Sequence, residues 1–179
     1  DLTYEKLLDT DMKSPAVYSF MAECKTAQQA PEEEIIAILD KAMEEFTKPY
    51  GEDVAPYLYN RAVHKAAAGK YREAVVDFND VEHIYGGQGS ADFYLERART
   101  ESKCRMYQQA LDDLKEACEL APQAEEPFAE LATLQVTIKD YPGAVETAQH
   151  LINTHPESPY GYRFLGFAQA NMGQKAEGT

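Results

Sequence analysis

The chain has 179 residues, of which 27% are charged and 44% are hydrophobic, and its net charge is −14 at pH 7. This balance is typical of a folded globular protein of one or two domains. The acidic charge argues against nucleic acid and anionic membrane surfaces as partners, and no apolar run approaches the roughly 18 residues needed for membrane insertion.

Helical patterns begin in the first third of the chain. We interpret residues 1–14 as an N-terminal extension or a capping helix. Within residues 15–54, apolar side chains recur three and four positions apart in two stretches, and the glutamates at 32–34 suit the positive end of a helix dipole. These patterns predict a degenerate helical hairpin over 15–54.

A short pattern that begins with tyrosine returns three times in the rest of the chain. It reads YREAVV at Tyr71, YQQALD at Tyr107 and YPGAVE at Tyr141, so the repeat length is 36 and then 34 residues. A period near 34 residues, with two helices in each repeat, is typical of a helical solenoid. We therefore expect full repeats at 55–88, 91–124 and 125–158.

A single further helix is predicted after the third repeat. Residues 159–179 are interpreted as the first helix of a fourth repeat or as a C-terminal cap. All of these segments together are expected to form one solenoid domain.

The small residues of each repeat resemble those of the tetratricopeptide-repeat family. They stand where the first helix of a repeat crosses the second, and where the second helix begins, and they let the two helix axes approach closely. They are Ala62, Ala98, Ala132 and Gly166, followed by Ala74, Ala110 and Ala144. Two departures from the family pattern are Arg61 and Arg97, which replace an apolar residue.

This resemblance implies an all-α fold, namely a right-handed α-solenoid of antiparallel helix pairs that forms a superhelix. Its concave face, lined by the first helix of each repeat, would bind a protein or peptide segment. The candidate residues on this face combine apolar, aromatic and basic side chains, and this mixture suits a segment with apolar anchors and some acidic residues. The candidate partner-binding residues carried over in this way are Tyr59, Val63, Leu95, Arg99, Lys103, Ala129, Thr133, Arg163 and Phe167.

Each candidate also has a purely structural interpretation. The aromatic and leucine candidates could simply pack between adjacent first helices. Arg99 and Lys103 lie four residues apart on one helical face, so they could be solvated, or paired with Glu96 or Glu101.

One subclass of the family holds the C-terminal carboxylates of a partner, as with heat-shock chaperones. It uses Lys and Asn on the groove face of the first repeat and Lys or Arg two repeats later. This chain has Tyr59 and Val63 at the first places and Glu126 and Glu130 at the later ones. Glutamates would repel such a ligand, which argues against this subclass.

Motifs for catalysis, metal binding or phosphate binding are absent from the sequence. The histidines form no His-x-x-x-His pair, the GGQGS stretch lacks the lysine of a phosphate-binding loop, and Gly-x-Ser-x-Gly does not occur. We expect no enzymatic activity, no metal and no cofactor; an enzyme would need a domain absent from this chain.

The leading alternative to groove binding is a structural role. The module would self-associate through the ends of the solenoid, the C-terminal end above all, or support a domain missing from this chain. The sequence does not identify the compartment. A start without methionine is expected for an exported, periplasmic bacterial protein whose leader was removed, and the alternative is a cytoplasmic protein.

Overall fold

The computed structural model describes residue 6 and residues 15–46 and 54–177, and within these ranges the regular structure is helical with no strand. Contacts divide the chain into two compact units, Asp1–Gln88 and Gly89–Thr179, here called unit 1 and unit 2. Apart from Lys6, the predicted extension at 1–14 lies outside the described residues. None of the described helices has the length and apolar character needed to cross a membrane.

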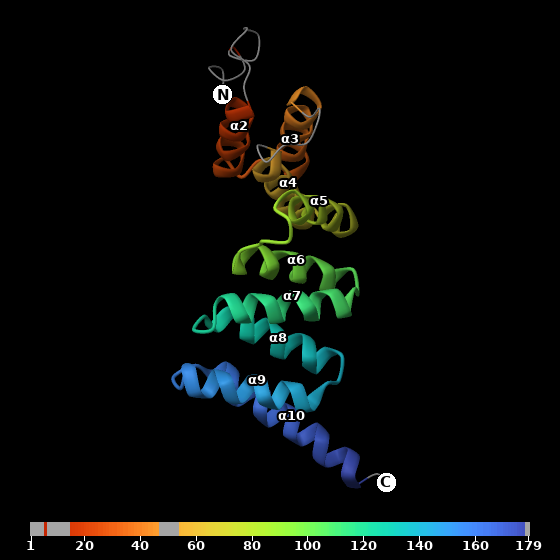
Figure 1. The fold of residues 1–179 in the computed structure, drawn as a ribbon, viewed down its shortest axis with the longest axis vertical. Helices are drawn as coiled ribbons and strands as arrows, with labels where there is room; N and C mark the ends of the chain where they lie inside the picture. The colour runs from red at the N-terminus through yellow and green to blue at the C-terminus, as the bar shows by residue number, and fades with distance from the viewer. Residues whose placement is uncertain (1–5, 7–14, 47–53, 178–179) are drawn as a thin grey trace. The chain divides into compact units, whose positions relative to one another are not determined.

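Unit 1 contains four described helices, and each packs against the next (Figure 1). Helix α3 begins directly after Pro31. The core of α2 and α3 contains Ala22, Ile35 and Leu39. The helices are α2 (Pro15–Ala27), α3 (Glu32–Phe46), α4 (Ala55–Ala67) and α5 (Tyr71–Ile84).

The described part of unit 2 contains five helices, and each packs against the next (Figure 1). Helices α6 and α8 are the first helices of their hairpins, and α7 and α9 are the second helices. Helix α10 packs on both α8 and α9. The bounds are α6 (Ala91–Lys103), α7 (Tyr107–Leu120), α8 (Glu125–Thr137), α9 (Tyr141–Thr154) and α10 (Pro159–Glu177).

The same tight turn joins the two helices of four hairpins. Its second residue has a left-handed backbone, with φ of 54° at Gln29, 78° at Gly69, 62° at Arg105 and 64° at Lys139. In each case the next amide donates to the carbonyl five residues before it, which closes the end of the first helix. The hairpin over α2 and α3 therefore has the turn of the other three, although no glycine in its sequence marks that turn.

The small residues at the helix crossings pack as their spacing predicts. The alanines at both crossing positions of the three full repeats are completely buried, so the two helices of each hairpin are in close contact. Gly166 is the exception, because no atom other than those of its chain neighbours and of its own helix backbone lies within 4 Å of the place where its side chain would begin. Helix α10 thus offers an uncovered crossing position.

Two ion pairs, one buried and one partly buried, explain the arginines that depart from the family pattern. In unit 2, Arg97 Nε donates to Asp113 Oδ2 at 2.6 Å and its second nitrogen donates to Asp113 Oδ1 at 2.8 Å. In unit 1, Arg61 makes the same two contacts with Asp77 at 2.8 Å each. In each pair the arginine is on the first helix of a hairpin and the aspartate, sixteen residues later in the sequence, is on the second helix.

Unit 1 adds further charges to this arrangement. Lys65 binds Asp77 at 2.8 Å, and Arg61 also reaches Asp40 on α3 at 3.0 Å. Burial by itself would lower the pKa of Arg61, but the hydrogen bonds and the charge of Asp77 raise it, so the guanidinium stays charged.

The third hairpin has a neutral version of the same contact. Leu131 and Thr147 occupy the positions of the arginine and the aspartate, and the Thr147 hydroxyl donates to Gln135 Oε1 at 2.8 Å. All three side chains are buried. The hairpin architecture therefore tolerates either an ionic or a neutral link between its helices.

Candidate functional site

A groove runs along the first helices of unit 2. One part has a volume of about 390 Å³ and extends to Lys103 and Tyr107, and the other has a volume of about 610 Å³ and extends to Arg163. The two parts share Arg99, Glu130 and Thr133 in their walls, so they form one continuous surface over α6, α8 and α10, here called the first-helix groove.

Arg99 lies in the middle of the groove and is surrounded by three glutamates. Its guanidinium donates to Glu130 at 3.0 Å, to Glu126 at 2.5 Å and to Glu96 at 2.9 Å. Burial by itself would lower the pKa of Arg99, but the hydrogen bonds to Glu126 and Glu130 outweigh burial and raise the pKa above its ordinary value. Because Arg99 is on α6 and two of its partners are on α8, the cluster ties two first helices together.

Of the structural alternatives left open for Arg99, the structure shows the pairing with Glu96. The contacts with Glu126 and Glu130 were missed, because those residues lie 27 and 31 positions away in the sequence. The sequence had indicated only that these two glutamates stand where a chaperone-type clamp would have Lys or Arg. Their positions in the repeats are the signal from which this pairing could have been inferred.

Lys103 and Arg163 are the other two cations of the groove. Both side chains are exposed, and within the described part of the chain neither has a recorded carboxylate partner. The Arg163 guanidinium lies 4.9 Å from the ring centre of Tyr160 and 4.8 Å from that of Phe164. These cation–π contacts hold Arg163 over two aromatic rings and leave its charge unneutralised.

The remaining predicted residues have different environments. Thr133 is exposed and central to the groove, whereas Leu95 is only 4% exposed, so the packing interpretation applies to its side chain. Phe167 is 49% exposed on α10 and does not line either part of the groove. Tyr59 and Val63 are half-buried residues of unit 1.

Tyr59 packs edge-on against Phe78, with ring centres 5.8 Å apart. Three aromatic residues of the groove were not among the candidates: Tyr107, Tyr160 and Phe164. Tyr107 begins α7 and belongs to the repeated tyrosine pattern, which had been read only as a mark of the repeat.

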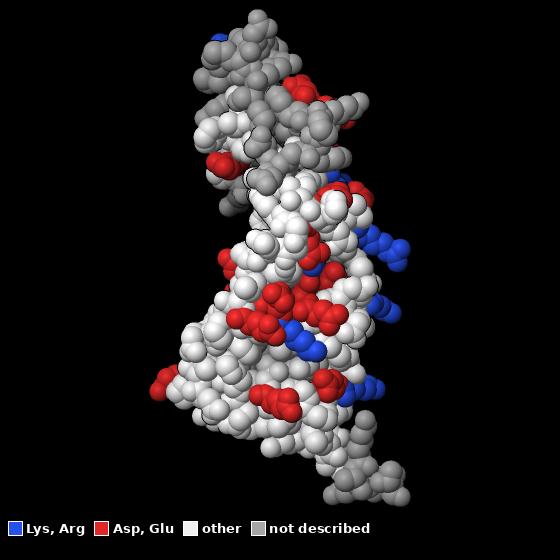
Figure 2. Space-filling model, viewed as in Figure 1, with Lys and Arg blue, Asp and Glu red and all other residues white. Residues whose placement is uncertain are grey.

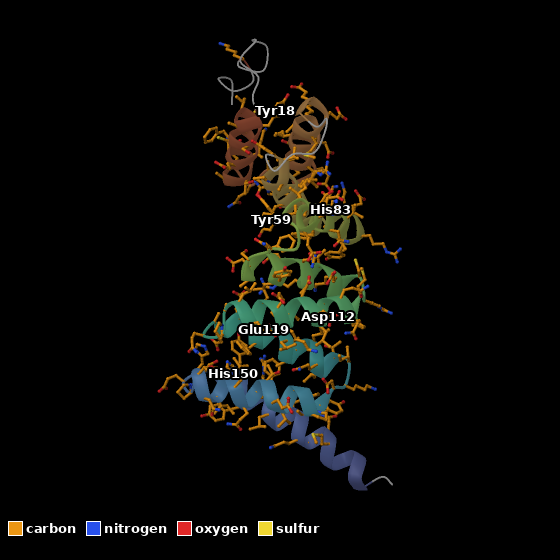
Figure 3. The ribbon with its side chains drawn as sticks, viewed as in Figure 1. Tyr18, Tyr59, His83, Asp112, Glu119 and His150 are labelled. Atoms are coloured by element: carbon orange, nitrogen blue, oxygen red, sulfur yellow. The ribbon has the colours of Figure 1, made fainter. Side chains whose placement is uncertain are left out.

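Acidic side chains gather on another surface of unit 2. Figure 2 shows them over the second helix α7, whose exposed acids are Asp112, Glu116 and Glu119. Figure 3 labels the first and last of these on the same helix. The described residues contain no group of three side chains suited to hold a metal ion.

Solved structures with a similar fold are tetratricopeptide-repeat proteins. MamA has a TM-score of 0.78 at 16% identity, covering 91% of this chain and 85% of MamA. YrrB, described as a TPR protein with an unusual peptide-binding site, has a TM-score of 0.77 at 17% identity, covering 94% of this chain and 83% of YrrB. A tetratricopeptide repeat protein from Parabacteroides merdae has a TM-score of 0.75 at 15% identity, covering 99% of this chain and 63% of that protein.

These likenesses confirm the predicted resemblance at the level of the fold. The chain has the all-α helical-repeat solenoid fold of tetratricopeptide-repeat proteins. No protein-family model matches the sequence, and no curated protein matches it either.

Proposed function

We propose that this protein with the tetratricopeptide-repeat fold is a non-enzymatic scaffold, and that it binds a protein or peptide segment in the first-helix groove. The observation that carries this proposal is the groove itself, which combines aromatic rings, hydroxyl groups and unneutralised cations in one exposed surface. Such a mixture provides both apolar contact area and polar groups that fix the position of a ligand.

The arrangement of the groove also favours binding at a low entropic cost. The Arg99 cluster fixes α6 against α8, and the aromatic contacts fix Arg163 on α10. A surface that is ordered before the ligand arrives loses little conformational freedom on binding. The peptide-binding site described for YrrB adds support by analogy of fold.

Filling the groove should weaken binding. We expect Thr133→Tyr to weaken the binding of peptides selected on the wild-type chain by more than about tenfold, because a large ring would occupy the exposed surface that both parts of the groove share. The peptides would come from a random 12-residue display library, and binding would be measured by fluorescence anisotropy.

Thr26→Tyr on α2 is the matched control. Thr26 is exposed like Thr133, and both hydroxyls donate to the carbonyl four residues earlier. Circular dichroism should give the same helical signal for both variants. Full binding by a folded Thr133→Tyr variant would rule out the groove as the binding surface.

Self-association through α10 is the second candidate, and a specific observation favours it. Tyr162, Gly166 and Gln169 are exposed on α10, whereas the equivalent residues of α4 and α6 are buried under the second helix of their hairpins. A helix of a second copy could cover this surface. Phe164 on the same helix would not take part in such a contact, because it is 7% exposed and packs in the core with Leu151.

A charge on the exposed face of α10 tests this candidate. If two copies associate there, Tyr162→Glu should convert a dimer to a monomer in sedimentation velocity, because Tyr162 is 55% exposed and its replacement removes apolar contact area. Lys115→Glu on α7 is the control for an added negative charge and should leave the dimer intact. A wild-type chain that stays monomeric at high concentration would eliminate this role.

A further inference from the structure

We propose that the ligand of the first-helix groove is an extended acidic peptide segment, with two carboxylates about six to eight residues apart that bind Lys103 and Arg163. This inference rests on the proposed function and names the chemistry of the ligand. It also gives the three cations of the groove different roles: Arg99 is a structural link, and the other two contact the ligand.

The role of Arg99 follows from its partners. A guanidinium has five N–H donors, and the three glutamates already accept from its Nε and from both of its terminal nitrogens. A ligand carboxylate would have to displace one of these glutamates from the guanidinium. The displaced glutamate would then be a negative charge without its cation, next to the other two glutamates. Arg99 therefore holds α6 and α8 in position and has little capacity left to bind a partner.

Lys103 and Arg163 are the cations left for a ligand. They are exposed, they lack a recorded ion pair, and they lie at opposite ends of the groove with the neutralised Arg99 between them. The cation–π contacts of Arg163 restrict its side chain and so reduce the entropy that a salt bridge to it would cost. An acidic ligand would thus meet two separate points of attraction.

The distance between these points sets the spacing of the ligand carboxylates. Lys103 is the last residue of α6 and Arg163 is near the start of α10, and α8 lies between these helices. Packed helices are about 8–10 Å apart and rise about 1.5 Å per residue, so the two positions are separated diagonally by roughly 20–25 Å. An extended peptide advances about 3.3 Å per residue and covers this distance in about seven residues.

The rest of the groove suits the middle of such a segment. The rings of Tyr107 and Tyr160 offer apolar surface, because Tyr107 is half-buried and Tyr160 is 41% exposed, and the hydroxyls of Ser102 and Tyr107 offer polar groups near the Lys103 end. Outside the groove, the exposed acids of α7 would repel the same ligand. Within the groove, Glu125, Glu126 and Glu130 line the wall as well, so attraction for a carboxylate is restricted to Lys103 and Arg163, and the acids of the ligand are expected only at the two positions that meet them.

Peptide selection on the whole chain tests the inference. A random 12-residue display library would be selected at low salt, and the peptides retained would be sequenced and synthesised. We expect enrichment of Asp or Glu at two positions six to eight residues apart. Replacing both acids by their amides should weaken binding by about tenfold or more, and added salt should weaken the acidic peptide more than its amide form.

Charge-reversal variants show which side chains make the contacts. We expect Lys103→Glu and Arg163→Glu each to weaken binding of the acidic peptide by about fivefold to tenfold, and Lys115→Glu, which adds the same charge on α7, to have little effect. A peptide in which one acid is changed to lysine should regain affinity for one of the two groove variants and not for the other. Such a charge swap would assign each end of the peptide to its cation.

The outcomes separate the inference from the proposed function. Selected peptides that Thr133→Tyr blocks, but that are basic or insensitive to Lys103→Glu and Arg163→Glu, would overturn the acidic ligand and leave groove binding standing. Peptides that still bind Thr133→Tyr, or a selection that enriches no sequence, would overturn both.

Discussion

Asp113→Ala is expected to lower the free energy of unfolding of unit 2 by about 3–5 kcal/mol, because it leaves the charge of Arg97 buried without its carboxylate. Arg97 is 6% exposed and Asp113 is 7% exposed, so water cannot replace the lost partner. The cost reflects the loss of the Asp113 carboxylate beside a buried guanidinium, and it does not measure how much the intact ion pair contributes to stability.

The third hairpin supplies a rescue variant. The triple change Arg97→Leu, Glu101→Gln and Asp113→Thr introduces the three residues that this hairpin has at the equivalent positions. There the threonine and glutamine form a buried hydrogen bond of 2.8 Å. We expect the triple variant to recover most of the lost stability, to within about 1 kcal/mol of the wild type, because a well-packed neutral contact can replace a buried ion pair.

Urea unfolding followed by circular dichroism would measure both variants. Hydrogen exchange of the α6 and α7 amides would show whether the change is confined to this hairpin. Equal losses in Asp113→Ala and in the triple variant would mean that the buried charge is not the cause.

Leu151→Ala is expected to destabilise unit 2 by about 2–5 kcal/mol, because the change leaves a cavity in a closely packed core. Leu151 is fully buried and packs with Ala132 and Ala148 at the crossing of α8 and α9, and with Phe164 of α10. Its loss therefore weakens the contacts of three helices at once, including the two that carry the Arg163 end of the groove.

Leu120→Ala is the matched control, since the same atoms are removed from a side chain that is 49% exposed. We expect that variant to change the free energy of unfolding by less than about 1 kcal/mol. Urea unfolding of the two variants side by side makes the comparison. A Leu151→Ala loss no larger than the Leu120→Ala loss would contradict the described core.

The regular features of the fold were predictable from the sequence because they depend on local spacing. The repeated tyrosines open the second helices α5, α7 and α9, and the alanine that recurs once in each first helix, at 62, 98 and 132, identified its buried face. The residues 62, 98 and 132 are completely buried for that reason. The hairpin at α2 and α3 was expected only as a degenerate one, although Gln29 forms the same left-handed turn as Arg105 and Lys139 in the full repeats.

The candidate site was predictable only as a set of residues on one helical face. Arg99, Lys103, Thr133 and Arg163 do line the groove, whereas Leu95 is buried. Helical periodicity places a residue on a face, but the degree of its exposure depends on what the neighbouring helices cover. Leu95 and Lys103 were both expected on the groove face of α6, but Leu95 is buried and Lys103 is exposed.

The sequence by itself determined the helical hairpins, their period and the small residues at their crossings, because helix spacing and close packing act over a few residues or one repeat. Only the tertiary structure decided which charges remain available. Arg99 is neutralised by glutamates 27 and 31 residues away, and Arg97 by an aspartate sixteen residues away. Charges interact through space, so their pairing is set by how the helices meet and not by their order along the chain.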